Sequence, residues 1–249
     1  CISIQKNIER IGGCMRIGEI EYTNLTDDFG YWTVKVEDIG DYLPIKIKDR
    51  ADDYNPFIGW KISDDVEKFI ENTVRKIAVP DDAEISKVIP WGNYFDRDNY
   101  YYHKFHHVPH VDYPGWVGNL WLSEHPEGSR GTQFYNYKDD WKRDRFDFPR
   151  PEELLEQYET SWQQWEISKV ESYGFEYMGT APAVKNTITI YNSCVPHKAF
   201  IGDDVERSWS QLVQISKRRF YDENDDNMTR EEYKNLQDFL NSNVSNFKK

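Results

Sequence analysis

Residues 106–116 read HHVPHVDYPGW and contain three of the six histidines in this 249-residue chain. His110 and Asp112 form a His-x-Asp pair between Pro109 and Pro114, which stiffen the backbone on both sides. On a β-strand, residues i and i+2 point to the same face, about 7 Å apart along the backbone. The stretch therefore predicts one imidazole and one carboxylate that project into the same space.

The segments on either side have the composition of strands. Aromatic residues make up 16% of the chain, and short aromatic or β-branched runs bounded by Pro, Gly, Asn or Asp predict strands. These runs are GYWTVKV (30–36), ISKVI (85–89), NYYYHKF (99–105), WVGNLWLSE (116–124), TQFYNY (132–137), NTITIYN (186–192), HKAFI (197–201) and ERSWSQLVQIS (206–216). We expect a mainly β protein with a jelly-roll or barrel core and flanking helices, rather than a βαβ array.

Three helices are predicted around this core. Residues 63–78 have Ser63 as the N-cap and an apolar stripe at helical spacing, formed by Val66, Phe69, Ile70, Val74 and Ile77. Residues 151–170 begin with a proline that suits a first helical position, and Thr229 with Glu232 forms a capping box for the last helix. We expect one domain over 1–249. It comprises an N-terminal α/β flanking region (1–84), a jelly-roll core (85–220) with a helical insertion at about 139–180, and a C-terminal helix (221–249).

Composition excludes several classes of function. The net charge of −13 disfavours nucleic acid as a partner, because such binding depends on neutralising phosphates, and disfavours an anionic membrane. The charge favours a neutral or cationic substrate. Cys1, Cys14 and Cys194 form neither a zinc motif nor a paired disulfide framework. We therefore expect a soluble protein of a reducing compartment, the cytoplasm.

The His-x-Asp pair has the residue types of a metal site. Two histidines and one carboxylate on one side of an octahedral ion form the facial triad of non-haem Fe(II) oxygenases. The second histidine must come from elsewhere, and His197 opens a predicted strand just after a proline. A predicted hairpin across the turn GDD (202–204) brings Arg207 opposite, or nearly opposite, His197. Because arginine matches a carboxylate, this pattern suits a molecule such as 2-oxoglutarate, which chelates iron at one end and carries a carboxylate at the other.

These residues resemble the Fe(II)/2-oxoglutarate-dependent dioxygenases, whose motif is HxD, a long gap, then His, with Arg or Lys about ten residues on. The closest likeness is to the prolyl-4-hydroxylase-like branch, through YHKFHHVPHVDY (102–113) and GNLWLSEHPEGSRGTQFY (118–135). The resemblance covers residues 95–138 and 185–216. The branch usually has lysine at the position of Arg207, and the Arg-x-Ser motif of other branches is absent here.

The resemblance implies a double-stranded β-helix (jelly roll) core and the catalytic residues of the family. His110, Asp112 and His197 would bind Fe(II), while Arg207 and either Tyr101 or Tyr102 would bind 2-oxoglutarate. With O₂, such an enzyme hydroxylates a C–H bond and releases succinate and CO₂. The substrate would be an amino acid, a peptidyl residue or a small metabolite.

Two other functions are consistent with the same residues. In a non-catalytic binding or structural module of cupin, lectin or capsid type, His110 and Asp112 would be structural or would hold a structural ion. The second alternative is a zinc hydrolase whose metal ion is bound by His110, Asp112 and His197. On the strand after the pair, Asn119 and Trp121 could line a pocket, and apolar packing explains Trp121 equally well. We expect His125, in the loop SEHPEGS, to be exposed.

Overall fold

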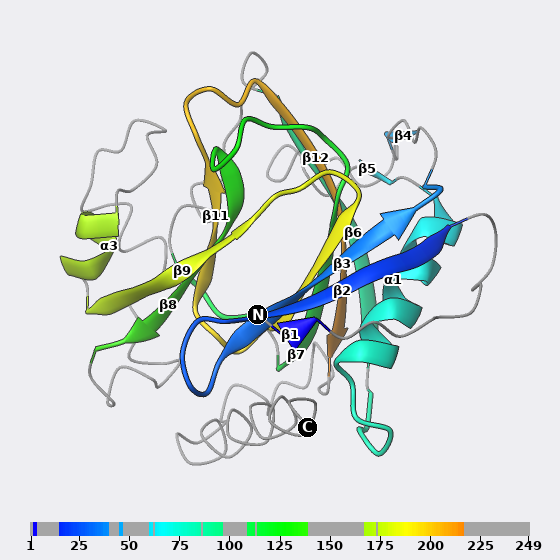
Figure 1. The fold of residues 1–249 in the computed structure, drawn as a ribbon, viewed down its shortest axis with the longest axis horizontal. Coiled ribbons are helices and arrows are strands. Elements are labelled where there is room, and N and C mark those ends of the chain that lie inside the picture. Colours follow the sequence, from blue (N-terminus) through cyan, green and yellow to red (C-terminus); the bar gives the residue numbers. More distant parts are fainter. Residues whose placement is uncertain are drawn as a thin grey trace.

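A computed structural model describes residues 15–39, 63–85, 87–96, 109–112, 114–138, 167–172 and 174–216, and the backbone of 2–3, 45–46 and 60–61. Two antiparallel sheets dominate these residues, so the expectation of a mainly β protein is confirmed (Figure 1). In sheet order, the larger one contains β1 (Ile2–Ser3), β2 (Arg16–Asn24), β3 (Gly30–Glu37), β10 (Thr187–Asn192), β7 (Gly115–Trp121), β12 (Arg207–Ser216), β6 (Lys87–Asp96), β5 (Trp60–Lys61) and β4 (Ile45–Lys46). The smaller one contains β11 (His197–Ile201), β8 (Arg130–Tyr137) and β9 (Phe175–Pro182).

Helix α1 (Asp64–Ile77) forms where the sequence predicts it. The Ser63 side chain accepts a hydrogen bond from the Val66 N–H at 3.2 Å, and acidic residues occupy the positive N-terminal turn. The whole predicted apolar stripe is buried against the outer face of the larger sheet. Gly118 on β7 permits this packing, because a Cβ there would collide with the side chains of Val74 and Ile70.

Alternation along the strands divides the core into two layers. Residues such as Leu120, Ile188 and Val213 face the cluster that includes α1. Their neighbours in sequence face the other way, and Val117, Tyr191 and others cluster with Phe134 of the smaller sheet. The larger sheet is therefore covered by α1 on one face and by the smaller sheet on the other. The space between the sheets is the interior in which the candidate site lies.

Two sequence predictions about organisation need correction. The helical insertion does not extend to residue 180, because α3 (Ile167–Ser172) ends early and β9 begins at Phe175. This strand is hard to recognise because Phe175 and Ala181 are its only fully buried residues. The N-terminal region also contributes strands β2 and β3 to the larger sheet beside β10.

The predicted hairpin of β11 with β12 is wrong. Strand β11 pairs with β8, whereas β12 pairs with β6 and β7 in the other sheet. The connection crosses between the sheets because Val205 is buried with Ile201 and with Phe95 of β6. This apolar contact draws the turn inward and separates the two strands.

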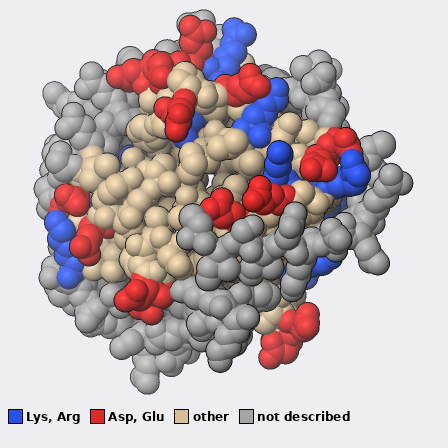
Figure 2. Space-filling view, viewed as in Figure 1, with Lys and Arg blue, Asp and Glu red and all other residues tan. Residues whose placement is uncertain are grey.

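Several predicted elements lie outside the described residues: the strand at 99–105, the helix at 151–170 up to residue 166, and the C-terminal helix at 221–249. No helix among the described residues is long and apolar enough to cross a membrane. In the face shown in Figure 2, a continuous uncharged area of the described surface lies left of the centre, with acidic and basic side chains around it.

Candidate metal centre

Backbone pairing brings the His-x-Asp pair to His197. The N–H of His110 donates to the carbonyl of His197 at 3.0 Å, and the N–H of His197 donates back to the carbonyl of His110 at 2.9 Å. Residues directly opposite in such an antiparallel pair have side chains on the same face. The two imidazole rings accordingly lie with their centroids 4.8 Å apart. The Asp112 N–H donates to the Ser193 carbonyl at 2.9 Å, which continues the pairing along the segment.

The three side chains converge on one point. The candidate ligand atoms of His110, Asp112 and His197 all lie within 4.8 Å of one another. Asp112 Oδ1 is 3.8 Å from His110 Nε2, and Asp112 Oδ2 is 3.4 Å from His197 Nε2. His197 is buried, whereas His110 and Asp112 are partly exposed. The group is therefore held in the protein interior on the side of His197. On the side of His110 and Asp112 it is accessible to solvent, so a further ligand could reach a bound ion from there.

The orientation of His197 is fixed by its second ring nitrogen. Nδ1 lies 2.8 Å from the carbonyl oxygen of Val195, which can only accept a hydrogen bond. Nδ1 therefore carries a proton, and Nε2 faces Asp112 as the potential ligand atom. A hydrogen bond from the non-ligating nitrogen to a carbonyl is the usual arrangement of a metal-binding histidine.

Tyr191 forms the inner wall of the site. Its ring packs edge-on against His197 with centroids 5.0 Å apart, and the residue is 3% exposed. Burial, with a further contribution from the negative charge of Asp112, raises the pKa of its phenol well above the usual value. Tyr191 therefore stays neutral at every ordinary pH. Asp112 is the acidic member of the group, and it offsets part of a cation's charge.

The residues fit a metal ion. Donors about 2.1 Å from a common ion lie about 3 Å apart in cis positions, so the observed separations require only small rotations of the three side chains. Two imidazoles and one carboxylate on one side leave the remaining positions of an octahedral ion to other ligands. The group could therefore bind a divalent transition metal.

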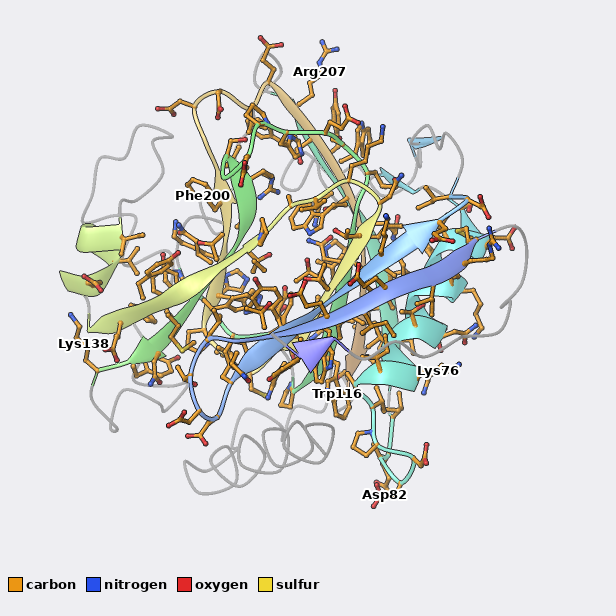
Figure 3. All side chains as sticks on the ribbon, viewed as in Figure 1. Lys76, Asp82, Trp116, Lys138, Phe200 and Arg207 are labelled. Atoms are coloured by element: carbon orange, nitrogen blue, oxygen red, sulfur yellow. The ribbon has the colours of Figure 1, made fainter. Side chains whose placement is uncertain are left out.

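The other predicted site residues are not brought to this point. Arg207 pairs in register with Asp96 of β6, and its side chain is exposed and points away from the body of the protein (Figure 3). Tyr101 and Tyr102 lie outside the described residues. The predicted exposure of His125 is wrong, because it is partly buried, with Nε2 3.2 Å from Ser208 Oγ.

The interior contains a cation that the sequence analysis missed. Arg130, the first residue of β8, is 7% exposed, and its guanidinium lies 5.1 Å from the centre of the Trp121 ring. Arg130 has the same strand parity as Phe134, which pairs with His197. Arg130 lies just before the predicted run TQFYNY, which contains Phe134. Strand alternation counted back from Phe134 places the Arg130 side chain on the same face, and this could have identified Arg130 from the sequence. Asn119 and Trp121 are both buried in the interior, and the Trp121 ring packs beside the guanidinium of Arg130.

Comparison of the chain with models of known protein families finds no match, and comparison with curated proteins finds none either.

Proposed function

We propose that the protein is an Fe(II)- and 2-oxoglutarate-dependent oxygenase that hydroxylates a C–H bond of an amino acid, a peptidyl residue or a small metabolite. The observation that carries the proposal is the convergence of His110, Asp112 and His197 within 4.8 Å. This donor set is the one used by non-haem Fe(II) oxygenases. The motif resemblance at the same three residues supports the same assignment.

The order of the strands supports a double-stranded β-helix. Along the chain, the connections cross repeatedly between the sheets: β6, β7, β10 and β12 lie in the larger sheet, and β8, β9 and β11 lie in the smaller one. The segment of His110 pairs with β11 and so extends the smaller sheet. With this bridge the smaller sheet has four paired segments, which lie opposite β6, β12, β7 and β10 of the larger sheet, and the metal group is at the inner face of the His110–β11 pair. This is the arrangement expected for a jelly roll with an interior site.

Each of the three candidate ligands, and the tyrosine beside them, has a defined part in this function. His110 and His197 supply neutral nitrogen ligands, and Asp112 supplies the anionic ligand. Together with 2-oxoglutarate and O₂, a ferrous ion would supply the oxidising chemistry, and succinate and CO₂ would be the by-products. Tyr191 and the buried side of His197 keep water from the inner side of the centre. The substrate would approach from the side on which His110 and Asp112 are exposed.

Anaerobic addition of Fe(II) and 2-oxoglutarate tests the proposal. The expected result is a weak visible charge-transfer band and, once air is admitted with a substrate, release of succinate. Asp112→Asn should remove the band because the only anionic ligand is lost. Glu124→Gln, which neutralises an exposed acid in the β7–β8 loop, should leave the band unchanged. A protein that binds Fe(II) but gives no band with 2-oxoglutarate would contradict the proposal.

The same measurements separate the two alternatives. A non-catalytic binding module gives no band and no succinate. A zinc hydrolase retains Zn²⁺ after purification and releases no succinate, since a zinc ion has no redox chemistry.

A further inference from the structure

We propose that Asn192 is a positioning residue of the candidate metal centre, because its side chain orients the peptide bond that holds the backbone of Asp112. The inference rests on metal binding by the three candidate ligands, which is one part of the proposed function, and it does not depend on the oxygenase reaction. The observations that carry it lie in the turn at residues 193–196, which connects β10 to β11 and directly follows Asn192.

This turn contacts two of the three candidate ligands through its carbonyl groups. The Ser193 carbonyl accepts a hydrogen bond from the Asp112 N–H at 2.9 Å, and the Val195 carbonyl accepts one from Nδ1 of His197 at 2.8 Å. The third ligand, His110, pairs with the backbone of His197, where the turn ends. The directions of the two carbonyls therefore affect where the carboxylate of Asp112 and the imidazole of His197 lie.

The side chain of Asn192 orients the first of these carbonyls. Its Oδ1 accepts a hydrogen bond from the Cys194 N–H at 2.8 Å, which closes an Asx turn. That N–H and the Ser193 carbonyl belong to the same peptide bond, whose atoms lie in one plane. Any rotation of this plane that takes the N–H away from Asn192 also turns the carbonyl away from Asp112. Asn192 and Asp112 therefore hold opposite sides of one peptide unit.

The main chain of Asn192 supports the same turn. Its carbonyl accepts a hydrogen bond from the Val195 N–H at 3.3 Å, and the next N–H, that of Ser193, donates to the carbonyl of Gly115 on β7 at 3.1 Å. The start of the turn is thus anchored to the larger sheet. Asn192 contributes an acceptor from its main chain as well as one from its side chain.

The apolar side chains of the turn are anchored in both layers of the core. Cys194 is buried in the cluster that includes α1, and Val195 is buried in the cluster that includes Phe134. These contacts hold the turn in place without the Asn192 side chain. A change at Asn192 should therefore reorient one peptide plane rather than displace the whole turn.

Burial makes the hydrogen bond of Asn192 hard to replace. Asn192 is 4% exposed and Cys194 is 0% exposed, so solvent does not readily supply another acceptor for the Cys194 N–H. Leaving a buried N–H without an acceptor costs free energy, and rotation of the peptide plane toward another acceptor relieves that cost. Among the described residues, Nδ2 of Asn192 has no hydrogen-bond partner, so the oxygen is the end of the amide that fixes the turn.

The test measures the affinity of the metal-free protein for Co(II), whose visible absorption reports binding without any turnover. Asn192→Leu has a side chain of similar shape but no acceptor, and it should bind Co(II) about 10-fold more weakly, as expected for loss of a group that orients a metal ligand. Asn192→Asp keeps an oxygen that can accept from the Cys194 N–H in either protonation state. Its affinity should fall by less than about 3-fold.

Thr187→Val is the matched control. Thr187 is 7% exposed, and its hydroxyl donates to the Val184 carbonyl. It lies at the other end of β10, about 16 Å from Asn192 along the strand. The variant loses a buried hydrogen bond between side chain and backbone, as Asn192→Leu does, so it should also lower Tm. Its Co(II) affinity should stay within about 2-fold of the wild type, because the turn is untouched.

Hydrogen exchange of the Asp112 amide reports the proposed contact directly. In the metal-free protein this amide should exchange faster in Asn192→Leu than in the wild type, by a larger factor than in Thr187→Val. Asn192→Asp should restore slow exchange. A residue that only stabilises the fold would change the exchange rate in Asn192→Leu and Thr187→Val alike.

Several results would overturn the proposal. They are wild-type Co(II) affinity in Asn192→Leu, equal weakening in Asn192→Leu and Asn192→Asp, and equal weakening in Asn192→Leu and Thr187→Val. If Asn192→Leu does not fold, Asn192→Ser replaces it, because a serine hydroxyl closes such a turn more weakly. Asn192→Ser must then bind Co(II) more weakly than Asn192→Asp, and equal affinities of the two reject the positioning role.

The same titrations separate this proposal from the proposed function. If the variants differ as expected but Fe(II) and 2-oxoglutarate give no charge-transfer band in the wild type, the oxygenase assignment fails and the role of Asn192 stands. If the band forms and the variants bind Co(II) equally well, the role of Asn192 fails alone. If the wild type binds no Co(II), the metal centre is rejected and both proposals fall.

Discussion

The different burial of His110 and His197 predicts that the two histidines contribute differently to the stability of the metal-free protein. His197→Ala and His110→Ala should both abolish stabilisation by Fe(II), but they should differ in the absence of metal. The side chain of His197 is 5% exposed and that of His110 is 31% exposed. His197→Ala therefore removes a buried ring and its hydrogen bond to the Val195 carbonyl, whereas His110→Ala removes a ring at the edge of the site.

The magnitudes follow from these contacts. Loss of a buried ring with one hydrogen bond should cost about 2–3 kcal/mol of unfolding free energy. His110→Ala should cost less than about 1 kcal/mol. Fe(II) at 100 times its dissociation constant should stabilise the wild type by about 2.7 kcal/mol. For a chain of this length the stabilisation by metal corresponds to an increase in Tm of roughly 5–10 °C.

Anaerobic thermal unfolding with and without Fe(II) measures both effects. The wild type should gain stability with metal, and the two variants should not. Without metal, His197→Ala should melt below His110→Ala. Metal-dependent stabilisation that persists in either variant would show that the three residues do not form one site. Equal melting temperatures of the metal-free variants would refute the reasoning from burial.

Three further predictions concern the rest of the fold. Gly118→Ala should lower the free energy of unfolding by about 1–3 kcal/mol in urea titrations, because the added methyl collides with Val74 of α1; no loss would mean that the helix does not pack there. Ser63→Ala should cost about 1 kcal/mol in the same assay through loss of the N-cap, while Ser63→Asp should retain most of the stability. Lys198 is fully buried, and burial lowers its pKa to about 7. Because the unfolded state then binds more protons, wild-type stability should rise between pH 7 and about pH 10, and this rise should be smaller in Lys198→Met.

Local chemistry explains what could be predicted from the sequence. The limits of α1 follow from the Ser63 cap and a 3.6-residue apolar period, both of which act within a few residues. The strand HKAFI was predicted with its observed limits because Pro196 precedes it and Gly202 follows it. The relation of His110 to Asp112 required only the two-residue period of a strand. Each of these features depends on neighbours in the chain.

The strands that pair with β11 and β12 could not be predicted from such local features of the sequence. A short turn between two strands favours a hairpin, and nothing in GDD shows that the chain crosses to the opposite sheet. The crossing depends on the burial of Val205 against Phe95, more than one hundred residues away in sequence. The exposed position of Arg207 is a consequence of the register that β12 adopts with β6 and β7.

The sequence alone therefore determined the chemical types at the centre: a His-x-Asp pair, a later histidine, and an arginine on the predicted strand that follows it. Only the tertiary structure decided that His197 lies opposite His110 and that Arg130, not Arg207, has its guanidinium in the interior. The physical reason is that side-chain direction along one strand follows from local geometry, whereas the identity of the facing strand depends on burial of apolar surface over the whole molecule.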